Sequence, residues 1–327
     1  PTLTVNTATL RFIENSSTPV SLFSGSVVST IESADLIKSI ALTVTNVVNG
    51  SDEVMNIDGT NIALTNGNTG TTATNSMVYN VLFSESTAVI VVTKSTGITS
   101  ANAQTLVDGM SYINSSNDPT VLGATTRVIS LVQILDTGGT TNWGTSVYGV
   151  DVKNLSGLSS SITITPTNDA PTAANHTVTT NEDTDYTFVT SNFGFSDVDS
   201  SDSLSKVQIT SLPSVGVLKL NGANVAVNDE ISAVDIASGK LTFTPALNGN
   251  GEGYTSFGFK VSDGTAYSTN AYIMTVDVTP VNDAPTVANA IANQNASVSN
   301  AFSYVVPANT FADVDTGDTL TYTATLA

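Results

Sequence analysis

The sequence contains no cysteine, few basic residues, few strong helix formers and no long apolar run. The lack of cysteine excludes disulfide bonds, thiolate zinc sites and cysteine nucleophiles, and it is compatible with either redox compartment. No stretch reaches the roughly 20 continuous apolar residues that a membrane-spanning helix needs. We therefore expect no membrane insertion, and we look for function in the polar residues.

Basic residues are scarce: 9 Lys and Arg stand against 28 Asp and Glu, which gives a net charge of -19. This balance argues against nucleic-acid binding, because displacing counterions from phosphates requires Lys and Arg. It equally disfavours an anionic membrane surface. Acidic groups in such excess repel one another, so we expect a bound divalent cation to neutralise some of them.

Two acidic elements occur twice at nearly the same spacing. The linker Asn168-Asp169-Ala170-Pro171-Thr172 recurs 114 residues later as Asn282-Asp283-Ala284-Pro285-Thr286. An Asp-x-Asp loop follows each linker, at Asp197-Val198-Asp199 and at Asp313-Val314-Asp315. Paired elements at a fixed spacing are typical of a tandem array. The chain also opens with Pro1-Thr2, the last two letters of the same linker, and we expect it to be a piece of a longer array.

The repeat spacing predicts three domains: 1–166, which is a longer variant, 167–281, and 282–327, which is the truncated start of a third. Short alternating apolar and polar runs, separated by Gly, Asn, Asp or Pro, predict an all-β fold of antiparallel sandwiches. Examples are Val217–Leu220, which meets an Asn-Gly turn, and Tyr272–Val278. One helix is expected near Ser100–Met110, and a strand is expected over Tyr148–Val152.

The acidic loops have the chemistry of a calcium site. Calcium takes six to eight oxygen ligands from carboxylates, carbonyls, Asn side chains and water. Asp197 and Asp199 lie two apart in one loop, so we expect them to converge on one ion, with Asp263 from the loop before the last strand. The predicted set at the first linker is Glu14, Asn168, Asp169, Asp197, Asp199 and Asp263. The predicted set at the second linker is Glu182, Asp183, Asn282, Asp283, Asp313 and Asp315.

The opposite end of the first domain departs from this pattern. It has Glu32-Ser33-Ala34-Asp35 in place of Asp-x-Asp, and it lacks the Asn-Asp-Ala letters. No calcium site is expected there. The alternative for all these acids is that they are solvated turn residues, since Asp and Asn favour turns for local reasons.

Together the Asn-Asp-Ala-Pro linkers, the Asp-x-Asp loops and Val261-Ser262-Asp263-Gly264 before the last strand resemble bacterial cadherin-like repeats of long secreted adhesins of the repeats-in-toxin (RTX) type. The resemblance implies tandem cadherin-like or immunoglobulin-like β-sandwiches, with Ca2+ bound where repeats of the same chain meet. It also implies a secreted protein of the bacterial cell surface, in which the repeats act as an extender in cell adhesion or biofilm attachment. Its partner would be a cell-surface glycan or the same protein on another cell.

Other functions have weaker support. His176 is the only histidine, and it begins a predicted strand, so a structural role is favoured over catalysis. A glycosidase needs two carboxylates across a cleft, and nothing in the sequence selects one pair; we expect no enzyme. A carbohydrate-binding module of a secreted polysaccharide-active protein is the main alternative, with Trp143 as the residue that would stack on a sugar. A homophilic adhesive array, which would self-associate with calcium, also stays open.

Overall fold

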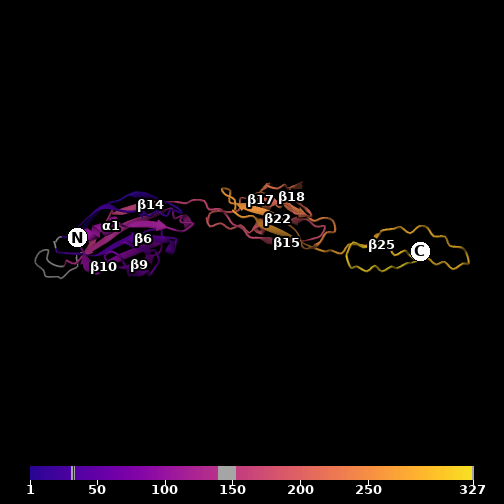
Figure 1. Cartoon of the computed structure of the whole chain (residues 1–327), viewed down its shortest axis with the longest axis horizontal. Coiled ribbons are helices and arrows are strands. Elements are labelled where there is room, and N and C mark those ends of the chain that lie inside the picture. The colour runs from indigo at the N-terminus through magenta and orange to yellow at the C-terminus, as the bar shows by residue number, and fades with distance from the viewer. Residues whose placement is uncertain (31, 33, 139–151, 326–327) are drawn as a thin grey trace. The chain divides into compact units, whose positions relative to one another are not determined.

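The chain divides into two compact units in the computed structural model (Figure 1). Unit 1 comprises Pro1–Asp169 together with Val198–Ser201, and unit 2 comprises Ala170–Asp197 and Asp202–Ala327. The structure describes residues 1–327 except 31, 33, 139–151 and 326–327. The expected strand over Tyr148–Val152 and the candidate residue Trp143 therefore lie outside the described residues, apart from Val152.

The first unit is built almost entirely of strands, and its elements surround one core (Figure 1). Its strands are β1 (Thr2–Asn6), β2 (Thr9–Ile13), β3 (Val20–Ser21), β4 (Ser24–Ser29), β5 (Ile37–Val44), β6 (Glu53–Ile57), β7 (Thr60–Ala63), β8 (Thr69–Thr71), β9 (Val78–Ser84), β10 (Thr87–Ile98), β11 (Ser111–Asn114), β12 (Thr126–Asp136), β13 (Val152–Asn154) and β14 (Ser159–Thr165). The large sheet has the order β2-β14-β12-β5-β10-β9-β8, with β13 beside β12; the second sheet has the order β3-β11-β6-β7, and β1 pairs with β4.

The longest helix among the described residues, α1 (Ser100–Asp108), lies within the stretch expected to be helical. It begins after Thr99, whose side chain accepts a hydrogen bond from the Asn102 amide, as N-cap residues do. Its buried residues join the core of unit 1, and the helix contacts β4. Short 3-10 helices at Gly50–Asp52 and Val121–Gly123 complete the unit.

A buried ion pair crosses the core of unit 1. Arg127 on β12 donates from Nε to Glu53 Oε2 at 2.8 Å and from Nη2 to Glu53 Oε1 at 2.9 Å. Both side chains are fully buried. The Tyr112 hydroxyl donates to Glu53 Oε2 at 2.8 Å. The second function of Arg127 is to anchor the loop after β11, because it also donates to the carbonyls of Pro119 and Ala124.

The first part of unit 2 is a smaller sandwich. Its strands are β15 (His176–Asn181), β16 (Tyr186–Thr187), β17 (Lys206–Ser211), β18 (Val217–Leu220), β19 (Ala223–Asn224), β20 (Glu230–Ser232), β21 (Leu241–Thr244), β22 (Gly251–Ser262) and β23 (Tyr272–Thr279), with the helix α2 (Ala233–Ala237) and a 3-10 helix at Thr190–Phe193. One sheet has the order β15-β23-β22-β17-β20 and the other β16-β21-β18-β19. The all-β prediction is confirmed, and the Asn221-Gly222 turn joins β18 to β19 as expected.

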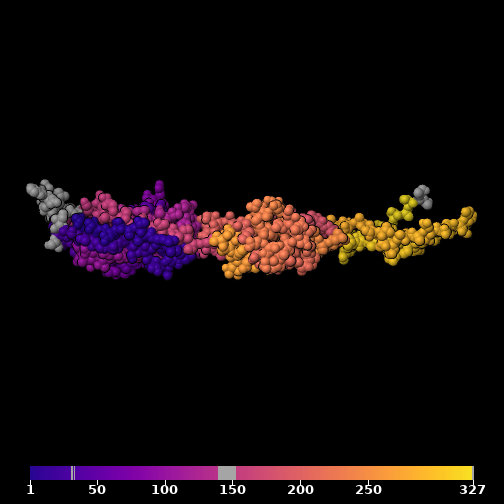
Figure 2. All heavy atoms as spheres, turned by 90° about the horizontal axis from the view of Figure 1, so that it is seen from above, coloured from indigo at the N-terminus to yellow at the C-terminus, as the bar shows by residue number. Residues whose placement is uncertain are grey.

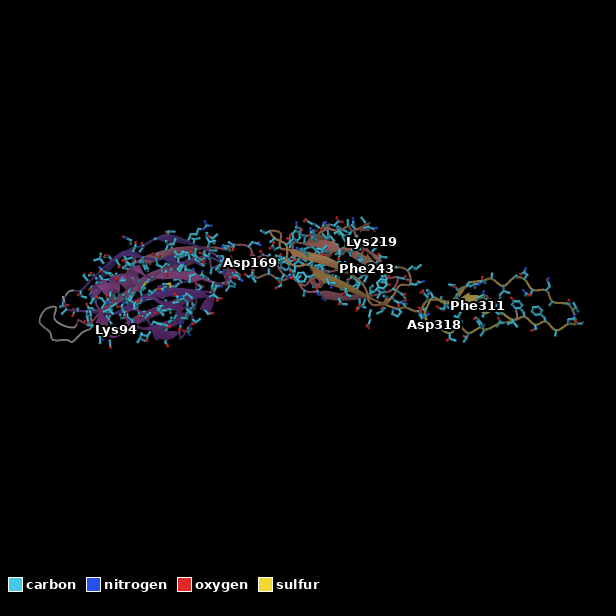
Figure 3. The ribbon with its side chains drawn as sticks, viewed as in Figure 1. Lys94, Asp169, Lys219, Phe243, Phe311 and Asp318 are labelled. Atoms are coloured by element: carbon cyan, nitrogen blue, oxygen red, sulfur yellow. The ribbon has the colours of Figure 1, made fainter. Side chains whose placement is uncertain are left out.

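Aromatic rings make up part of the core of this sandwich, among them Phe243, which is labelled in Figure 3. Phe188 meets Phe257 edge to face with ring centres 5.5 Å apart, and Phe193 meets Phe259 in the same way at 5.1 Å. Each fully buried ring contributes about 1.5–3 kcal/mol through its removal from water. The alternating apolar positions of β22 therefore hold the two sheets together.

The residues from 282 onward form little regular structure. Their described part, residues 282–325, contains only β24 (Thr286–Val287) and β25 (Phe311–Ala312), and many of its apolar side chains are exposed. In the space-filling view, this yellow stretch is much thinner than either sandwich (Figure 2). Its apolar residues, among them Phe311 and Tyr322, line a cavity of about 500 Å³. The proposed three-domain boundaries stay a prediction.

Candidate cation-binding sites

A buried glutamate stands at the same place in both sandwiches. Glu14 directly follows β2, which pairs in parallel with β14, and Glu182 directly follows β15, which pairs in parallel with β23. Each continues the ladder through its amide, which donates to Thr165 O and Thr279 O respectively. Only 3% of Glu14 and 4% of Glu182 is exposed. The parallel pairing thus delivers one carboxylate to the start of each Asn-Asp linker.

Each glutamate is held by the linker that follows. Glu14 Oε2 accepts from the Thr167 amide at 2.6 Å, and Glu182 Oε1 accepts from the Val281 amide at 2.6 Å. The next residue turns the chain away, since Asn15 and Asp183 both adopt left-handed backbone angles, with φ of 61° and 55°. Asn and Asp tolerate this conformation better than most residues. Glu14-Asn15 and Glu182-Asp183 therefore form equivalent turns of the backbone.

The two Asn-Asp linkers also make the same contacts. The amide of Asp169 donates to Asp199 Oδ2 at 2.8 Å, and the amide of Asp283 donates to Asp315 Oδ2 at 2.7 Å. In each linker the Asn side chain donates to the carbonyl of the next residue. The second aspartate of each Asp-x-Asp loop thus lies against its linker, and the recurring sequence spacing has a recurring structure.

The third member of each acidic stretch, which was not in the predicted set, completes a carboxylate cluster. Carboxylate oxygens of Asp197, Asp202 and Asp263 lie within 4.8 Å of one another, and so do those of Asp313, Asp315 and Asp318. Asp197 lies near Asp263 as expected. Asp199 is not part of this cluster, because its carboxylate accepts from the Asp169 amide, and Asp202 is the third member. The signal for the missed residues was present, because Asp202 and Asp318 both stand five residues after the first aspartate of their stretch.

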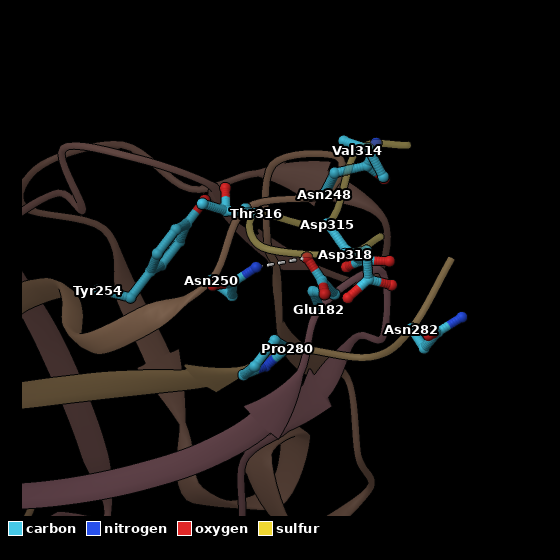
Figure 4. Close-up of a pocket in the computed structure, with 11 residues that line it drawn as sticks. Glu182, Asn248, Asn250, Tyr254, Pro280, Asn282, Val314, Asp315, Thr316 and Asp318 are labelled. Carbon is cyan, nitrogen blue, oxygen red and sulfur yellow. Dashed lines mark hydrogen bonds between the residues drawn. The ribbon is translucent and has the colours of Figure 1, made fainter. Parts of the chain in front are cut away.

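The second linker borders a polar pocket of about 620 Å³ within unit 2 (Figure 4). Glu182, Asp315 and Asp318 turn their carboxylates toward one another there. Asn250 donates to Glu182 Oε2 at 2.9 Å, and the Asn248 amide donates to Asp183 Oδ1 at 2.9 Å. The residues lining the pocket are Glu182, Asn248, Gly249, Asn250, Tyr254, Pro280, Asn282, Val314, Asp315, Thr316 and Asp318.

The pKa values reflect this crowding of acids. Burial raises the pKa of Asp283, and the charges of Asp315, Asp183, Glu182 and Asp313 raise it further. Burial likewise raises the pKa of Glu14 despite its bond from the Thr167 amide. The pKa of Glu182 is lowered instead, first by the bond from Asn250 and then by that from Val281. Raised values mark the carboxylates whose negative charge lacks compensation.

Several of these oxygens are shielded from water and accept no hydrogen bond from the described residues. They are Glu14 Oε1, Asp169 Oδ2 and Asp283 Oδ2. Shielded anionic oxygens without donors are costly unless a cation meets them. The donor set consists of carboxylates, Asn side chains and carbonyls, which suits a hard cation such as calcium.

The remaining candidates show no comparable arrangement. His176 is exposed at the start of β15. Across the described part of the chain, no helix is long and apolar enough to cross a membrane.

Comparison with known proteins supports the fold class. Residues 168–279 match the family described as bacterial Ig domain, and residues 284–327 match the family described as putative Ig domain. A search of curated proteins finds no match. These family matches cover the second sandwich and the final segment, and they support an immunoglobulin-like repeat.

Solved structures that resemble the chain include an endo-fucoidan hydrolase of glycoside hydrolase family 107 at 15% identity, with a TM-score of 0.22, over 72% of this chain and 28% of that one. The human Desmocollin-1 ectodomain matches at 8% identity and a TM-score of 0.30, over 84% of this chain and 40% of that one. The protocadherin Gamma B7 cadherin domains match at 11% identity and a TM-score of 0.29, over 88% of this chain and 53% of that one. The chain thus spans about a quarter to a half of the length of these proteins. The two family matches and the all-β sheets together support an immunoglobulin-like β-sandwich fold.

Proposed function

We propose that this chain is a set of calcium-rigidified extender repeats from a large, secreted, RTX-type adhesin of the bacterial cell surface. In this proposal it serves cell adhesion or biofilm attachment and has no enzymatic activity. The observation that carries the proposal is the recurrence of one arrangement. Each linker brings together a buried glutamate, an Asn-Asp pair and an Asp-x-Asp loop, at Glu14 and again at Glu182.

The residues of each linker have separate tasks in this mechanism. The glutamate is fixed by the amide two residues before the linker aspartate, so its carboxylate cannot swing into solvent. The Asp-x-Asp loop is tied to the linker through the aspartate amide. When bound, calcium supplies the double positive charge that turns the mutual repulsion of these carboxylates into a shared attraction. Holding strand ends, linker and loop to one ion would stiffen the joint.

The carbohydrate-binding alternative has no comparable observation in the described residues, and Trp143, its candidate contact, lies outside them. A glycan array separates the two proposals, because an extender repeat leaves the array blank and a carbohydrate-binding module does not.

The proposal is tested by melting the protein in calcium and in chelator. Folded sites bind calcium and the unfolded chain hardly does, so at 100 times the dissociation constant each site adds about 2.7 kcal/mol of stability. We expect unit 2 to melt several degrees higher in millimolar calcium, with sodium chloride of equal ionic strength as the control. Superimposable melting curves would refute the proposal.

Replacing the two aspartates of the first Asp-x-Asp loop tests whether calcium binds at the first linker. Asp197→Ala with Asp199→Ala is expected to lower the number of ions bound in titration calorimetry and to leave the circular dichroism spectrum unchanged. Both sandwich cores are built from strands that do not include this loop. Unchanged stoichiometry would show that the ion binds elsewhere. The matched control is Glu85→Gln, which removes an exposed charge of unit 1 outside both predicted sets.

A further inference from the structure

The outer face of the large sheet of unit 1 is more apolar than a sheet face in water usually is. In β10 the run Val89–Val92 is apolar at four successive positions, whereas a sheet with one face in water alternates apolar and polar residues. Two of these residues are completely buried in the core, and the other two, Val89 and Val91, lie on the outer face and stay partly exposed. On the neighbouring β9, labelled beside β10 in Figure 1, Val78 and Leu82 share this face and are 56% and 51% exposed.

The same face carries no charge. We call it the neutral face and define it as the outward residues of β9, β10, β5, β12 and β14; among its apolar members are Val78, Leu82, Val89, Val91, Val128 and Leu135. Its other members are small or uncharged polar residues. Charged residues do occur on these strands, but all of them belong to the opposite alternation, with the core residues; they are Lys38, Lys94, Arg127 and Asp136. Arg11, on the edge strand β2, stands at the border of the face.

The equivalent sheet of unit 2 has a charged outer face. Its order β15-β23-β22-β17-β20 corresponds strand for strand to β2-β14-β12-β5-β10, and the first pair is parallel in both. The outward positions there include Lys260 and Asp277, together with Lys206, which pairs with Glu230 at 2.7 Å. The lack of charge is therefore specific to unit 1 and does not follow from the type of sandwich.

The chemistry of the neutral face narrows the class of partner that fits it. Nucleic acids and anionic membranes require Lys and Arg, which the face lacks. Sugar rings are bound by stacking on aromatic side chains, and the outward residues of these five strands include no Phe, Tyr or Trp. A charged protein surface would lose its hydration there without gaining an ion partner. The neutral face therefore fits a flat, uncharged and partly apolar protein surface.

A second copy of this chain carries such a surface. Five strands about 4.8 Å apart, each roughly six residues long at about 3.4 Å per residue, span about 24 by 20 Å, or about 500 Å². Two copies would together bury about 1,000 Å², which is the lower limit for a specific interface and typical of weak, reversible association. Sheet faces rich in Val, Leu and Thr pack in this way, about 10 Å apart, inside ordinary sandwiches.

We propose that the neutral face of unit 1 packs against the neutral face of a second copy, in a weak dimer with two-fold symmetry. A two-fold contact pairs one patch with itself, so a single self-complementary face is sufficient. The acidic remainder of two chains with a net charge of -19 repels, and a face without charge is where they can approach closely. The inference goes beyond the proposed function, because it involves no linker residue and no calcium: it joins separate chains and stiffens none of them.

Sedimentation equilibrium of the full chain in chelator, up to millimolar concentration, measures this association. We expect a reversible monomer–dimer equilibrium that sodium chloride strengthens, because screening weakens the repulsion between acidic chains. Val91→Glu and Val78→Glu are each expected to weaken dimerisation about tenfold or more, since they bring like charges together between the faces. Val78 is more than half exposed, so its substitution tests the inference even where the Val91 variant does not fold. The matched control is Val27→Glu, which adds the same charge to a valine that is also 56% exposed but lies on β4, outside the neutral face.

The lack of cysteine permits a direct test of which faces meet. Thr43 lies on β5, the middle strand of the five, and a residue in the middle of a self-paired patch lies near its own copy. Thr43→Cys chains are therefore expected to be cross-linked into dimers by a bis-maleimide far more readily than Val27→Cys chains. Equal cross-linking of the two chains overturns the inference.

The remaining outcomes are as decisive. A chain that stays monomeric at millimolar concentration overturns the inference. A dimer that Val78→Glu and Val91→Glu leave intact overturns it too, because the contact then lies elsewhere, for instance on the exposed apolar residues of 282–325. A dimer that forms only with calcium has the same consequence. The proposed function fails separately, through melting curves that calcium leaves unchanged, and that result does not alter dimerisation in chelator.

Discussion

Glu14 and Glu182 occupy equivalent turns, yet their pKa values move in opposite directions. The difference lies in the second carboxylate oxygen. Glu182 Oε2 accepts from Asn250, whereas Glu14 Oε1 accepts no hydrogen bond from the described residues. A carboxylate whose two oxygens both accept hydrogen bonds is stabilised in its charged form. The Asn250 amide is thus the first cause of the lowered pKa of Glu182, whereas burial and the charges of Asp199 and Asp169 raise the pKa of Glu14.

Asp283 has a shielded Oδ2 that accepts no hydrogen bond from the described residues, and its pKa is raised by burial and by neighbouring carboxylates. We expect Asp283→Asn to raise the melting temperature of unit 2 in chelator, because it removes a shielded charge surrounded by other carboxylates. The same change is expected to weaken calcium binding, since a neutral amide replaces a charged ligand. Calorimetry with and without calcium measures both effects.

Glu252→Gln is the matched control for this change, because Glu252 is an exposed acid of the same unit. The interpretation of Asp283 is wrong if Asp283→Asn destabilises the protein without calcium. It is also wrong if Asp283→Asn and Glu252→Gln change the melting temperature and the calcium affinity equally.

The raised pKa values predict a pH dependence whose sign depends on calcium. For Glu14 and Asp283 the folded pKa exceeds the unfolded one, so their stabilising contribution is present at low pH and is lost as pH rises through the folded pKa. Without calcium, we therefore expect these groups to make the protein melt higher near pH 4, around their ordinary pKa values, than at pH 7. With calcium the trend reverses, because protons compete with the ion for the carboxylates. A melting series at both conditions measures this, and Glu14→Gln with Asp283→Asn should flatten both trends.

Sequence reasoning at this scale finds only part of the site. Asp197 and the Asn-Asp pairs were predicted because the acidic stretches repeat in the sequence, and Asp263 because its loop precedes the last strand, but Asp202 and Asp318 were missed although they also recur. Asn250 could not be predicted, since it lies 68 residues from Glu182 in the chain and sits among Gly and Asn residues that read as an ordinary turn.

At the scale of strands and helices, alternation of apolar residues predicts the long strands well. β18 and β23 lie where the pattern placed them, and α1 ends two residues before Met110. Two-residue strands such as β3 and β16 gave no periodic signal. The pairing of Glu53 with Arg127 was invisible as well, because charged residues in alternating strands read as the exposed face.

The Glu53–Arg127 pair should be costly to break. Arg127→Met leaves the Glu53 carboxylate buried without its cation, so we expect a loss of about 3–5 kcal/mol of unfolding free energy for unit 1. Replacing both, with Glu53→Leu and Arg127→Met, is expected to recover only part of that loss, because Tyr112 and the amides of Val48 and Asn49 then lose their acceptor. Urea unfolding of the single and double variants completes the cycle; a double variant as unstable as the single one contradicts the prediction.

At the scale of the whole molecule, the proposal concerns shape in solution. We expect residues 1–281 to have a variable, shorter maximum dimension in chelator, because the carboxylates around the first linker repel one another. Calcium is expected to lengthen the particle and narrow its distribution. Small-angle scattering measures the maximum dimension directly.

Sodium chloride of equal ionic strength is the control for this experiment, because screening relieves repulsion without bridging any groups. If salt extends the particle as much as calcium does, general electrostatics govern the joint and the extender mechanism is refuted.

The parallel pairing of β15 with β23 has a mechanical consequence. The chain enters the sandwich at the start of β15 and leaves it at the end of β23, and six residue pairs join the two strands from His176–Met274 to Asn181–Thr279. A pull on both ends of the sandwich would slide these strands along each other, so their hydrogen bonds would have to give way together. In an antiparallel hairpin pulled at its two ends, by contrast, the bonds open one after another. Resistance to traction is governed by the rate of unfolding, not by the equilibrium stability, and β2 with β14 repeats the arrangement in unit 1.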